Sequence, residues 1–284
     1  MNQNPTPLFA GTDVAARIER AEMHLAGEGA TAAARRDPGA RAFALPLAGG
    51  MACWAGAGSP LNKVAGLGFG GPISDQELTA VERAYADRDS PVPVELSTLA
   101  EPGIAAQLTR RGYQLMSFEN VLALPLRPGF ELRIADGLEI VETSPDQNAT
   151  WLDLLATGFA SPDTQGAATP EAFPREALER AIADLISASG FRLYLARRGG
   201  EPAGGASLRL DQGIAQLCGA ATLPAHRRRG VQSSLLSQRL RDAQAAGCDL
   251  AVATTQPGSK SQENMQRQGF ELLYVRAVLV REPA

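Results

Sequence analysis

The residues from Pro224 to Gln232, Pro-Ala-His-Arg-Arg-Arg-Gly-Val-Gln, have the types and spacing that best suit chemistry in this chain. An apolar run over 214–223 precedes them and predicts a buried strand, and apolar residues at helical spacing follow. We therefore expect a strand, a tight basic turn and a helix that begins at 230–232. The free N–H groups and the dipole of a helix start attract anions, and Gly230 lets a ligand approach the backbone. With three arginines in the turn, the pattern predicts a cradle for a diphosphate.

The same residues resemble a known family. Pro-x-x-Arg-x-x-Gly-x-Gln is similar to the cofactor signature of GNAT-superfamily N-acetyltransferases, Arg/Gln-x-x-Gly-x-Gly/Ala. Arg227 and Gly230 match it, whereas Gln232 stands where Gly or Ala is usual. The segment 264–270 is similar to the family's helix that ends in Gly-Phe after the fifth strand. The resemblance covers about 214–280 and implies that the chain binds acetyl-CoA, that is, acetylated coenzyme A.

The resemblance also implies a set of cofactor contacts. In the family the strand before the turn splays from its neighbour, and its free backbone groups pair with the pantetheine arm. A backbone N–H near Ala221 or Thr222 would stabilise the oxyanion of acyl transfer, which is worth ~3 kcal/mol in other oxyanion holes. The N–H groups of 228–234 would hold the diphosphate. The implied set is Ala220, Ala221, Thr222, Arg227, Arg228, Arg229, Gly230, Val231, Gln232, Ser233 and Ser234.

The groups that would transfer protons are less evident. The family often places a Tyr four residues before Gly-Phe, where it protonates the leaving thiolate, and Met265 stands there. Ser261 and Asn264 are candidate catalytic donors acting through water, or else residues that cap the helix or face solvent. A base on the cofactor strand would need Asp or Glu, and Gln216 and Cys218 stand there instead. Cys218 is interpreted as a small core residue.

A repeat divides the chain into two halves. Arg-Arg-Gly-Tyr-Gln-Leu at 110–115 recurs as Arg-Gln-Gly-Phe-Glu-Leu at 267–272, 157 residues later. A strand-like run, a Pro-Gly pair and a helix-like run precede each copy, which indicates duplication of one α/β unit. An unrelated N-terminal α/β domain is the alternative. In the first half the corresponding helix starts with the capping box Ser-Asp-Gln-Glu at 74–77, whose carboxylates would repel phosphate.

The predicted fold is α/β (α+β), with two tandem GNAT-like acyl-CoA N-acyltransferase units, each a mixed central sheet flanked by helices. Residues 1–128 would form a degenerate unit without the cofactor turn, and 137–284 the acetyltransferase domain. Pro, Gly and charged residues cluster between them, as in a linker. Within the second unit we expect a strand at 138–141, helices at 144–159 and 175–189, a loop at 160–174 and a hairpin across 199–200.

Composition excludes several classes of protein. The chain has 284 residues, 44% hydrophobic and 20% charged, enough for one large or two ordinary soluble domains. Its net charge of −4 and isoelectric point near 5.4 argue against nucleic-acid or membrane-surface binding. Three cysteines without a Cys-x-x-Cys pair and two histidines predict reduced thiols and no metal site. Without a signal peptide or a membrane-length apolar run, we expect a cytoplasmic protein.

These observations predict an acetyl-CoA-dependent N-acetyltransferase that transfers acetyl to a primary amine by direct attack in a ternary complex. The acceptor would be a small molecule or a peptide amine; its identity and the oligomeric state stay open. Asp163 and Glu171 in the loop could attract a cationic amine, or are ordinary loop charges. The alternative is a non-catalytic acyl-CoA-binding or sensing module, which Met265 favours. An Arg-rich nucleic-acid binder conflicts with the acidity, and no P-loop motif occurs.

Overall fold

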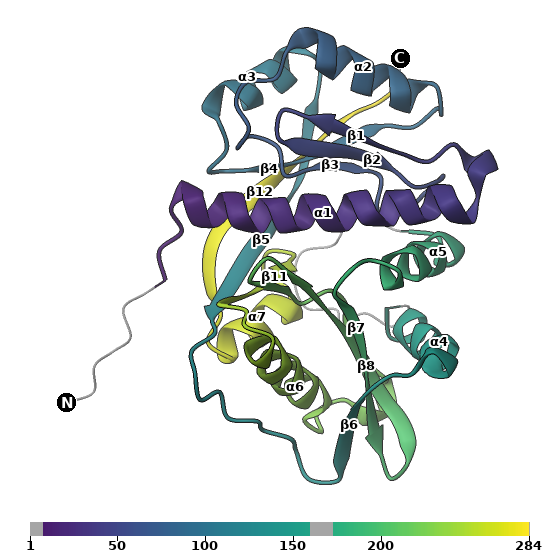
Figure 1. Ribbon diagram of the computed structural model, residues 1–284, viewed down its shortest axis with the longest axis vertical. Helices are drawn as coiled ribbons and strands as arrows, with labels where there is room; N and C mark the ends of the chain where they lie inside the picture. The colour runs from purple at the N-terminus through teal and green to yellow at the C-terminus, as the bar shows by residue number, and fades with distance from the viewer. Residues whose placement is uncertain (1–7, 160–172, 284) are drawn as a thin grey trace.

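The computed structural model describes residues 8–159 and 173–283, which form two α/β halves joined by 126–137 (Figure 1). The first half contains α1 (Thr12–Arg36), β1 (Phe43–Leu47), β2 (Gly50–Trp54), β3 (Lys63–Ala65), α2 (Asp75–Ala86), β4 (Val92–Ser97), α3 (Pro102–Arg110) and β5 (Gln114–Pro125). The second half contains β6 (Leu138–Glu142), α4 (Asn148–Phe159), α5 (Arg175–Ile186), β7 (Phe191–Arg198), β8 (Glu201–Asp211), β9 (Ile214–Gln216), β10 (Ala220–Thr222), α6 (Val231–Ala245), β11 (Leu250–Thr255), α7 (Lys260–Arg267) and β12 (Glu271–Arg281).

The described strands form one sheet in the order β1-β2-β3-β4-β12-β5-β11-β9-β8-β7-β6, and β10 pairs with β8 beyond β9. The two halves exchange their last strands. β12 lies between β4 and β5 of the first half, with Leu279 opposite Val94. β5 lies between β11 and β12 of the second half, with Ala123 opposite Val252. The mixed sheet flanked by helices confirms the predicted α/β class. The division into 1–128 and 137–284 stays a prediction, since neither segment alone holds the strands that its sheet contains.

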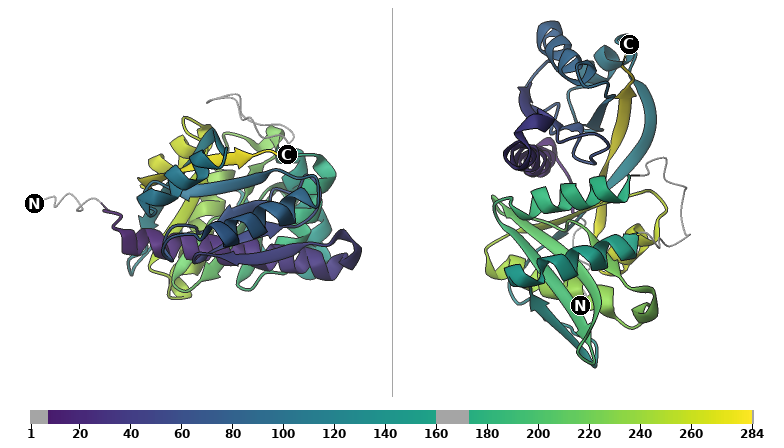
Figure 2. Two further views of the ribbon diagram at one scale, coloured as in Figure 1. Left: turned by 90° about the horizontal axis from the view of Figure 1, so that it is seen from above. Right: turned by 90° about the vertical axis from the view of Figure 1, so that its right-hand side faces the viewer.

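Helices cover both faces of this sheet. On one face, α2 and α3 cover the first half and α6 and α7 the second half, over two apolar clusters. On the other face lie α4, α5 and the long helix α1, which crosses the molecule between the two halves in Figure 1 and is seen nearly end-on in the right-hand view of Figure 2. The buried side of α1 consists mostly of alanine and glycine, so the helix packs closely against the strands.

Most local predictions hold. The repeat has the same order in both halves: strand, helix, Gly-aromatic pair, strand, as β4-α3-β5 and β11-α7-β12. The hairpin across 199–200 joins β7 and β8. The helix predicted over 144–159 is a short 3-10 turn, Pro145–Gln147, followed by α4, and the helix predicted over 175–189 ends at Ile186. Residues 160–172, with Asp163 and Glu171, lie outside the described residues.

Candidate functional site

The strand predicted over 214–223 is interrupted by a bulge. Gln216 of β9 pairs with Arg209 of β8, and Ala220 of β10 pairs with Ala206. Gln216 and Ala220 are four residues apart, whereas their partners on β8 are only three residues apart. One extra residue on one strand is the mark of a β-bulge. The bulge comprises residues 217–219 and divides the predicted strand into β9 and β10.

The bulge separates β10 from β11. Before it, Gln216 lies opposite Val252, and the N–H of Leu217 donates to the carbonyl of Val252 at 2.8 Å. After it, β10 pairs with β8 alone among the described strands, while β11 continues to Thr255 beside β5. The facing edges of β10 and β11 are therefore unpaired among the described residues, as the resemblance implies, and we call this break in the sheet the cleft.

The hydrogen bonds of β10 show which backbone groups face this cleft. The carbonyl of Gly219 and the N–H of Leu223 each bond to β8 at 3.0 Å. Because successive residues of an antiparallel strand direct their backbone groups to opposite edges, Ala221 also faces β8. Ala220 and Thr222 direct theirs to the open edge. Ala221 is therefore the wrong candidate for an oxyanion N–H donor, and Thr222 has the direction that this role requires.

Contacts from neighbouring elements brace the bulge. Ser207 donates from Oγ to the carbonyl of Cys218 at 2.7 Å and from its N–H to the carbonyl of Gly219 at 3.0 Å. The carbonyl of Ser207 accepts a 2.9 Å bond from Nη1 of Arg239, a buried residue of α6. Burial lowers the pKa of Arg239 to about 10, so its guanidinium stays charged at neutral pH. The helix and the bulge are thus held together by a charge-assisted hydrogen bond.

The start of α6 presents unpaired backbone donors. The helix begins at Val231, and its first bond runs from the N–H of Ser234 to the carbonyl of Gly230 at 2.9 Å. Among the described residues, no hydrogen bond engages the backbone N–H groups of 228–233. Free donors at a helix start, reinforced by the helix dipole, form an anion site. The predicted helix start is confirmed.

Gly230 is required by its backbone conformation and by its neighbour. Its φ is +78°, in the left-handed region that favours glycine, and a Cβ there would lie 2.7 Å from the Cβ of Ala135. The linker packs on this turn, because the N–H of Ala135 donates to Oγ of Ser234 at 3.0 Å. The N–H and the hydroxyl of Ser234 are both engaged in structural contacts. We therefore remove Ser234 from the expected diphosphate contacts.

Positive charge lies beside these donors. Arg228 and Arg229 are exposed, and neither forms an ion pair with another described residue. Arg227 is half-buried. The corresponding helix of the first half, α2, begins instead with the predicted capping box: Ser74 Oγ accepts from the N–H of Glu77, whose carboxylate accepts from the N–H of Ser74. Only the second half therefore combines free donors with cations at this turn.

A pocket of about 140 Å³ lies between the start of α6 and α7. Its lining residues are Gln232, Ser233, Leu236, Asn264, Met265, Arg267 and Gln268. Asn264 Nδ2 donates to Gln232 Oε1 at 2.7 Å, so one hydrogen bond joins the two walls. The amide of Asn264, a candidate proton donor, is engaged in this bond. Gly or Ala at position 232 could not form it.

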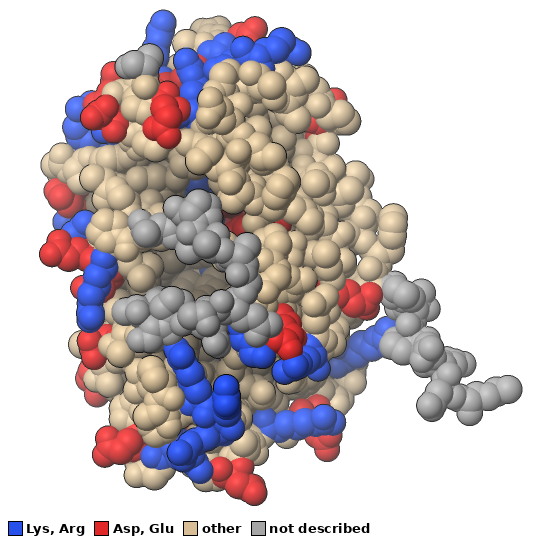
Figure 3. Space-filling view, turned by 180° about the vertical axis from the view of Figure 1, so that it is seen from behind, with Lys and Arg blue, Asp and Glu red and all other residues tan. Residues whose placement is uncertain are grey.

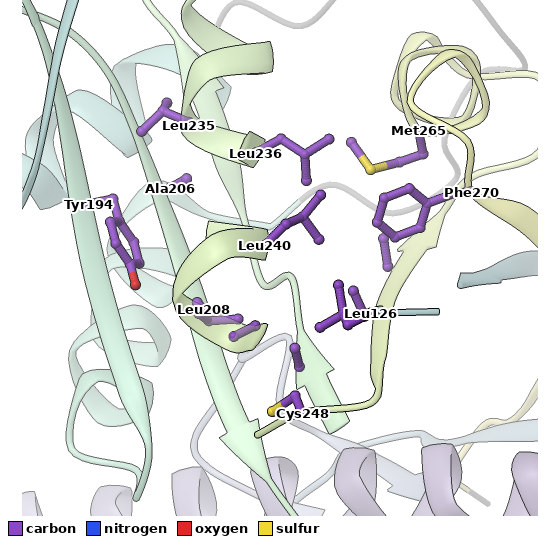
Figure 4. Packing of buried hydrophobic residues seen from close by; sticks show 14 of the residues in the cluster. Leu126, Tyr194, Ala206, Leu208, Leu235, Leu236, Leu240, Cys248, Met265 and Phe270 are labelled. Carbon is purple, nitrogen blue, oxygen red and sulfur yellow. The ribbon is translucent and has the colours of Figure 1, made fainter. Parts of the chain in front are cut away.

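Ser261, the other candidate donor, and the remaining residues considered for catalysis do not form a proton-transfer group. Met265 is buried in the core against Leu236 and Phe270 (Figure 4). Ser261 lies exposed in the first turn of α7, outside the pocket lining. Tyr274 is a core residue. Burial and the charge of Glu22 raise the pKa of Cys218 to about 12, which opposes a nucleophilic role.

Residues 8–159 and 173–283 include no group of three His, Cys, Asp or Glu side chains that could hold a metal ion. Over the same ranges, no helix has the length and apolar character needed to cross a membrane.

Comparison with known proteins supports this description. Residues 160–270 match the acetyltransferase (GNAT) family. No curated protein matches the chain. The fold is similar to a GCN5-related N-acetyltransferase from Kribbella flavida, with a TM-score of 0.66 and 20% identity over 95% of this chain and 96% of that one. It is also similar to a tandem GNAT protein from the clavulanic acid biosynthesis pathway, with a TM-score of 0.58 and 14% identity over 98% of both chains.

A GCN5-related N-acetyltransferase from Sphaerobacter thermophilus aligns with a TM-score of 0.54 and 15% identity, over 73% of this chain and 67% of that one. At these identities the likeness concerns the fold. Residues 160–270, within the second half, match a GNAT domain, and the whole chain is similar in fold to a tandem GNAT protein.

Proposed function

We propose that the second half binds acetyl-CoA in the cleft between β10 and β11, and that the protein is an N-acetyltransferase acting on a primary amine by direct attack. One observation carries this proposal. The bulge opens the sheet, and the same stretch of chain leads into a helix start whose N–H groups are free. An acyl-CoA needs both features: an open strand edge for its amide-containing arm and an anion site for its diphosphate.

The residues present suit that ligand. The backbone groups of Ala220 and Thr222 would pair with the pantetheine arm, and the N–H groups of 228–233 would hold the diphosphate. Arg228 and Arg229 would add charge, and Lys and Arg side chains gather on the lower half of the molecule, which the second half of the chain forms (Figure 3). When bound, acetyl-CoA would supply the acetyl thioester. The N–H of Thr222 would then stabilise the charge that develops on the acetyl oxygen.

A non-catalytic acyl-CoA-binding module is a second candidate. The observation that favours it is the set of contacts on α7. Met265 is part of the core, and Asn264 is hydrogen-bonded to Gln232, so neither the residue at the family's usual Tyr position nor its neighbour is free to protonate a thiolate. This candidate differs from the first in turnover and not in binding.

Isothermal titration of the full chain with acetyl-CoA tests the binding step. Pantetheine, which lacks the diphosphate, should bind far more weakly than coenzyme A. Arg229→Ala should weaken coenzyme A binding roughly tenfold, since a hydrogen bond to a charged group contributes at least about 1.5 kcal/mol. Arg241→Ala, on the helix that follows the turn, is the matched control, because Arg241 pairs with Asp242 and should leave the affinity unchanged.

Turnover separates the two candidates. Release of the free thiol of coenzyme A is followed with a panel of primary amines at saturating acetyl-CoA. Release that depends on an amine establishes the transferase. Binding without release across the panel supports the acyl-CoA-binding module, and no binding at millimolar acetyl-CoA rejects both.

A further inference from the structure

A charged cluster lies between α1 and the sheet, where the two halves meet. Its members are Glu19, Glu22, Lys63, Glu95, Glu119 and Arg276. They come from α1, β3, β4, β5 and β12, and some are 257 residues apart in the chain. All lie on the face of the sheet that α1 covers.

Two cations organise the cluster. Lys63 Nζ donates to Glu22 at 2.8 Å and to Glu95 at 3.0 Å. Arg276 donates from Nε to Glu19 at 2.8 Å and from Nη1 to Glu119 at 3.1 Å. Within this set four carboxylates share two cations. Arg209 also acts on Glu22 but is itself paired with Glu28 and Asp211, so carboxylates still outnumber cations.

One buried carboxylate in the cluster is not fully paired. The side chain of Glu19 is 1% exposed, and its Oε2 has no hydrogen-bond partner among the described residues. A buried carboxylate without compensation is costly, so the cluster favours one more cation or a proton. Burial raises the pKa of Glu19, and it raises that of Glu95 to about 7. Burial also opposes ionisation of Glu22, but the hydrogen bond from Lys63 and the charges of Lys63, Arg276 and Arg209 together outweigh it and lower the Glu22 pKa to about 2.

Glu22 connects the cluster to the residue that precedes the bulge. Gln216, the last residue of β9 before the bulge, donates from Nε2 to Glu22 at 3.3 Å and accepts from Nη1 of Arg209 at 2.8 Å. The charge of Glu22 also acts on the thiol of Cys218 within the bulge. Side-chain exposures of 15% for Glu22 and 31% for Glu119 show that the cluster is not sealed from solvent. Glu22, the member of the cluster nearest the bulge, is thus an ionised and partly accessible carboxylate.

We propose that the charged cluster binds a primary ammonium group, the acceptor of the proposed reaction, and that Glu22 is the carboxylate that contacts it. The proposal rests on the proposed function and names the residue that would hold its amine acceptor. An ammonium has three N–H donors and one positive charge, which matches what the cluster lacks. The first half, which has no cofactor turn, thereby contributes Glu22, with Lys63 and Glu95 as positioning residues.

Ammonium binding should release protons in a defined pH range. The groups that face Glu95 are Lys63, Arg276, Glu119 and Glu22. Below about pH 7 the carboxyl of Glu95 holds a proton in the free protein, and an added cation would displace that proton to solvent. Above this pH the carboxyl is already ionised, so binding should release none.

The test uses n-butylamine as the probe and n-butanol as its uncharged counterpart, added to the full chain. Nuclear magnetic resonance follows the side-chain NH₂ of Gln216. We expect butylamine to shift this resonance and butanol not to do so. Glu22→Gln should raise the half-saturating concentration at least tenfold, whereas Glu131→Gln, a change at an exposed carboxylate, should leave it unchanged. Calorimetry in two buffers should find proton release at pH 6 and none at pH 8.5.

Three results would overturn the proposal: equal shifts by butanol, an unchanged response in Glu22→Gln, or no response to molar butylamine. If Glu22→Gln fails to fold by circular dichroism, the more exposed Glu119→Gln takes its place, with an expected threefold loss. Coenzyme A affinity should be the same in wild type and variants. Failure of coenzyme A to bind would count against the proposed function. The response to butylamine tests the ammonium site independently of that result.

Discussion

At the scale of single residues, Gln232 is the position where this chain departs from the family signature. In the structure the side chain of Gln232 is hydrogen-bonded across the pocket to Asn264, a contact that Gly or Ala could not form. A ligand arm that passes between α6 and α7 would have to break this bond. The residue would thus lower the affinity for the cofactor, and its backbone N–H would still face the anion.

Gln232→Ala should therefore tighten coenzyme A binding about two- to tenfold, since a hydrogen bond of about 0.5–1.5 kcal/mol no longer has to be broken. Isothermal titration measures the change. Asn264→Ala should have the same effect, and the double variant should add nothing further. Weaker binding in Gln232→Ala would mean that the side chain contacts the ligand.

Predictions for single residues succeed where all the interacting groups lie within one short segment of the chain. The helix start at Gly230 and the capping box at Ser74 depend on neighbours within four residues, so the sequence indicates both. The engagement of Asn264 with Gln232 joins residues 32 positions apart, and no spacing rule connects them.

At the scale of elements, the bulge between β9 and β10 decides where the cleft lies. A regular strand over 214–223 would direct the backbone groups of Ala221 toward β11. The extra residue reverses this alternation, so Ala220 and Thr222 face the cleft instead. The contacts of Ser207 and Arg239 hold the bulge in place.

Ser207→Ala should loosen the bulge. It removes the 2.7 Å bond to the carbonyl of Cys218, and we expect a loss of about 1 kcal/mol in the free energy of unfolding together with a severalfold weaker binding of acetyl-CoA. Urea unfolding and calorimetry measure the two effects. Ser187→Ala removes a bond of the same kind and length, to the carbonyl of Asp184 on α5, and should reduce stability without changing affinity. Equal loss of affinity in both variants would contradict the role of the bulge.

The helix α1 is the element that sequence patterns did not indicate. Its buried residues are mostly small, so its apolar face gives a weak periodic signal. Its position across both halves brings Glu19 and Glu22 onto the sheet beside Arg276 and Lys63. The charged cluster depends on this helix.

At the scale of the whole molecule, strand exchange makes the two halves interdependent. β5 separates β11 from β12, and β12 separates β4 from β5. Removal of either half therefore exposes the edges of a central strand and the apolar residues on it.

Deletion of residues 1–125 should consequently give insoluble protein. Expression of 1–128 and 137–284 as two separate chains is the matched control, because only the linker is missing; the two should form a soluble heterodimer on size-exclusion chromatography. A soluble, monomeric 137–284 fragment that binds acetyl-CoA as tightly as the full chain would contradict the interdependence of the halves.

The sequence by itself determined the features that arise within one short stretch of chain: the basic turn, the helix start at Gly230, the hairpin and the repeated unit. Each rests on hydrogen bonding or apolar periodicity among near neighbours, which the order of residues specifies. Tertiary structure alone decided the strand exchange, the bulge and the charged cluster. These depend on which distant segments meet, and an ion pair such as Glu19–Arg276 leaves no periodic trace in the chain.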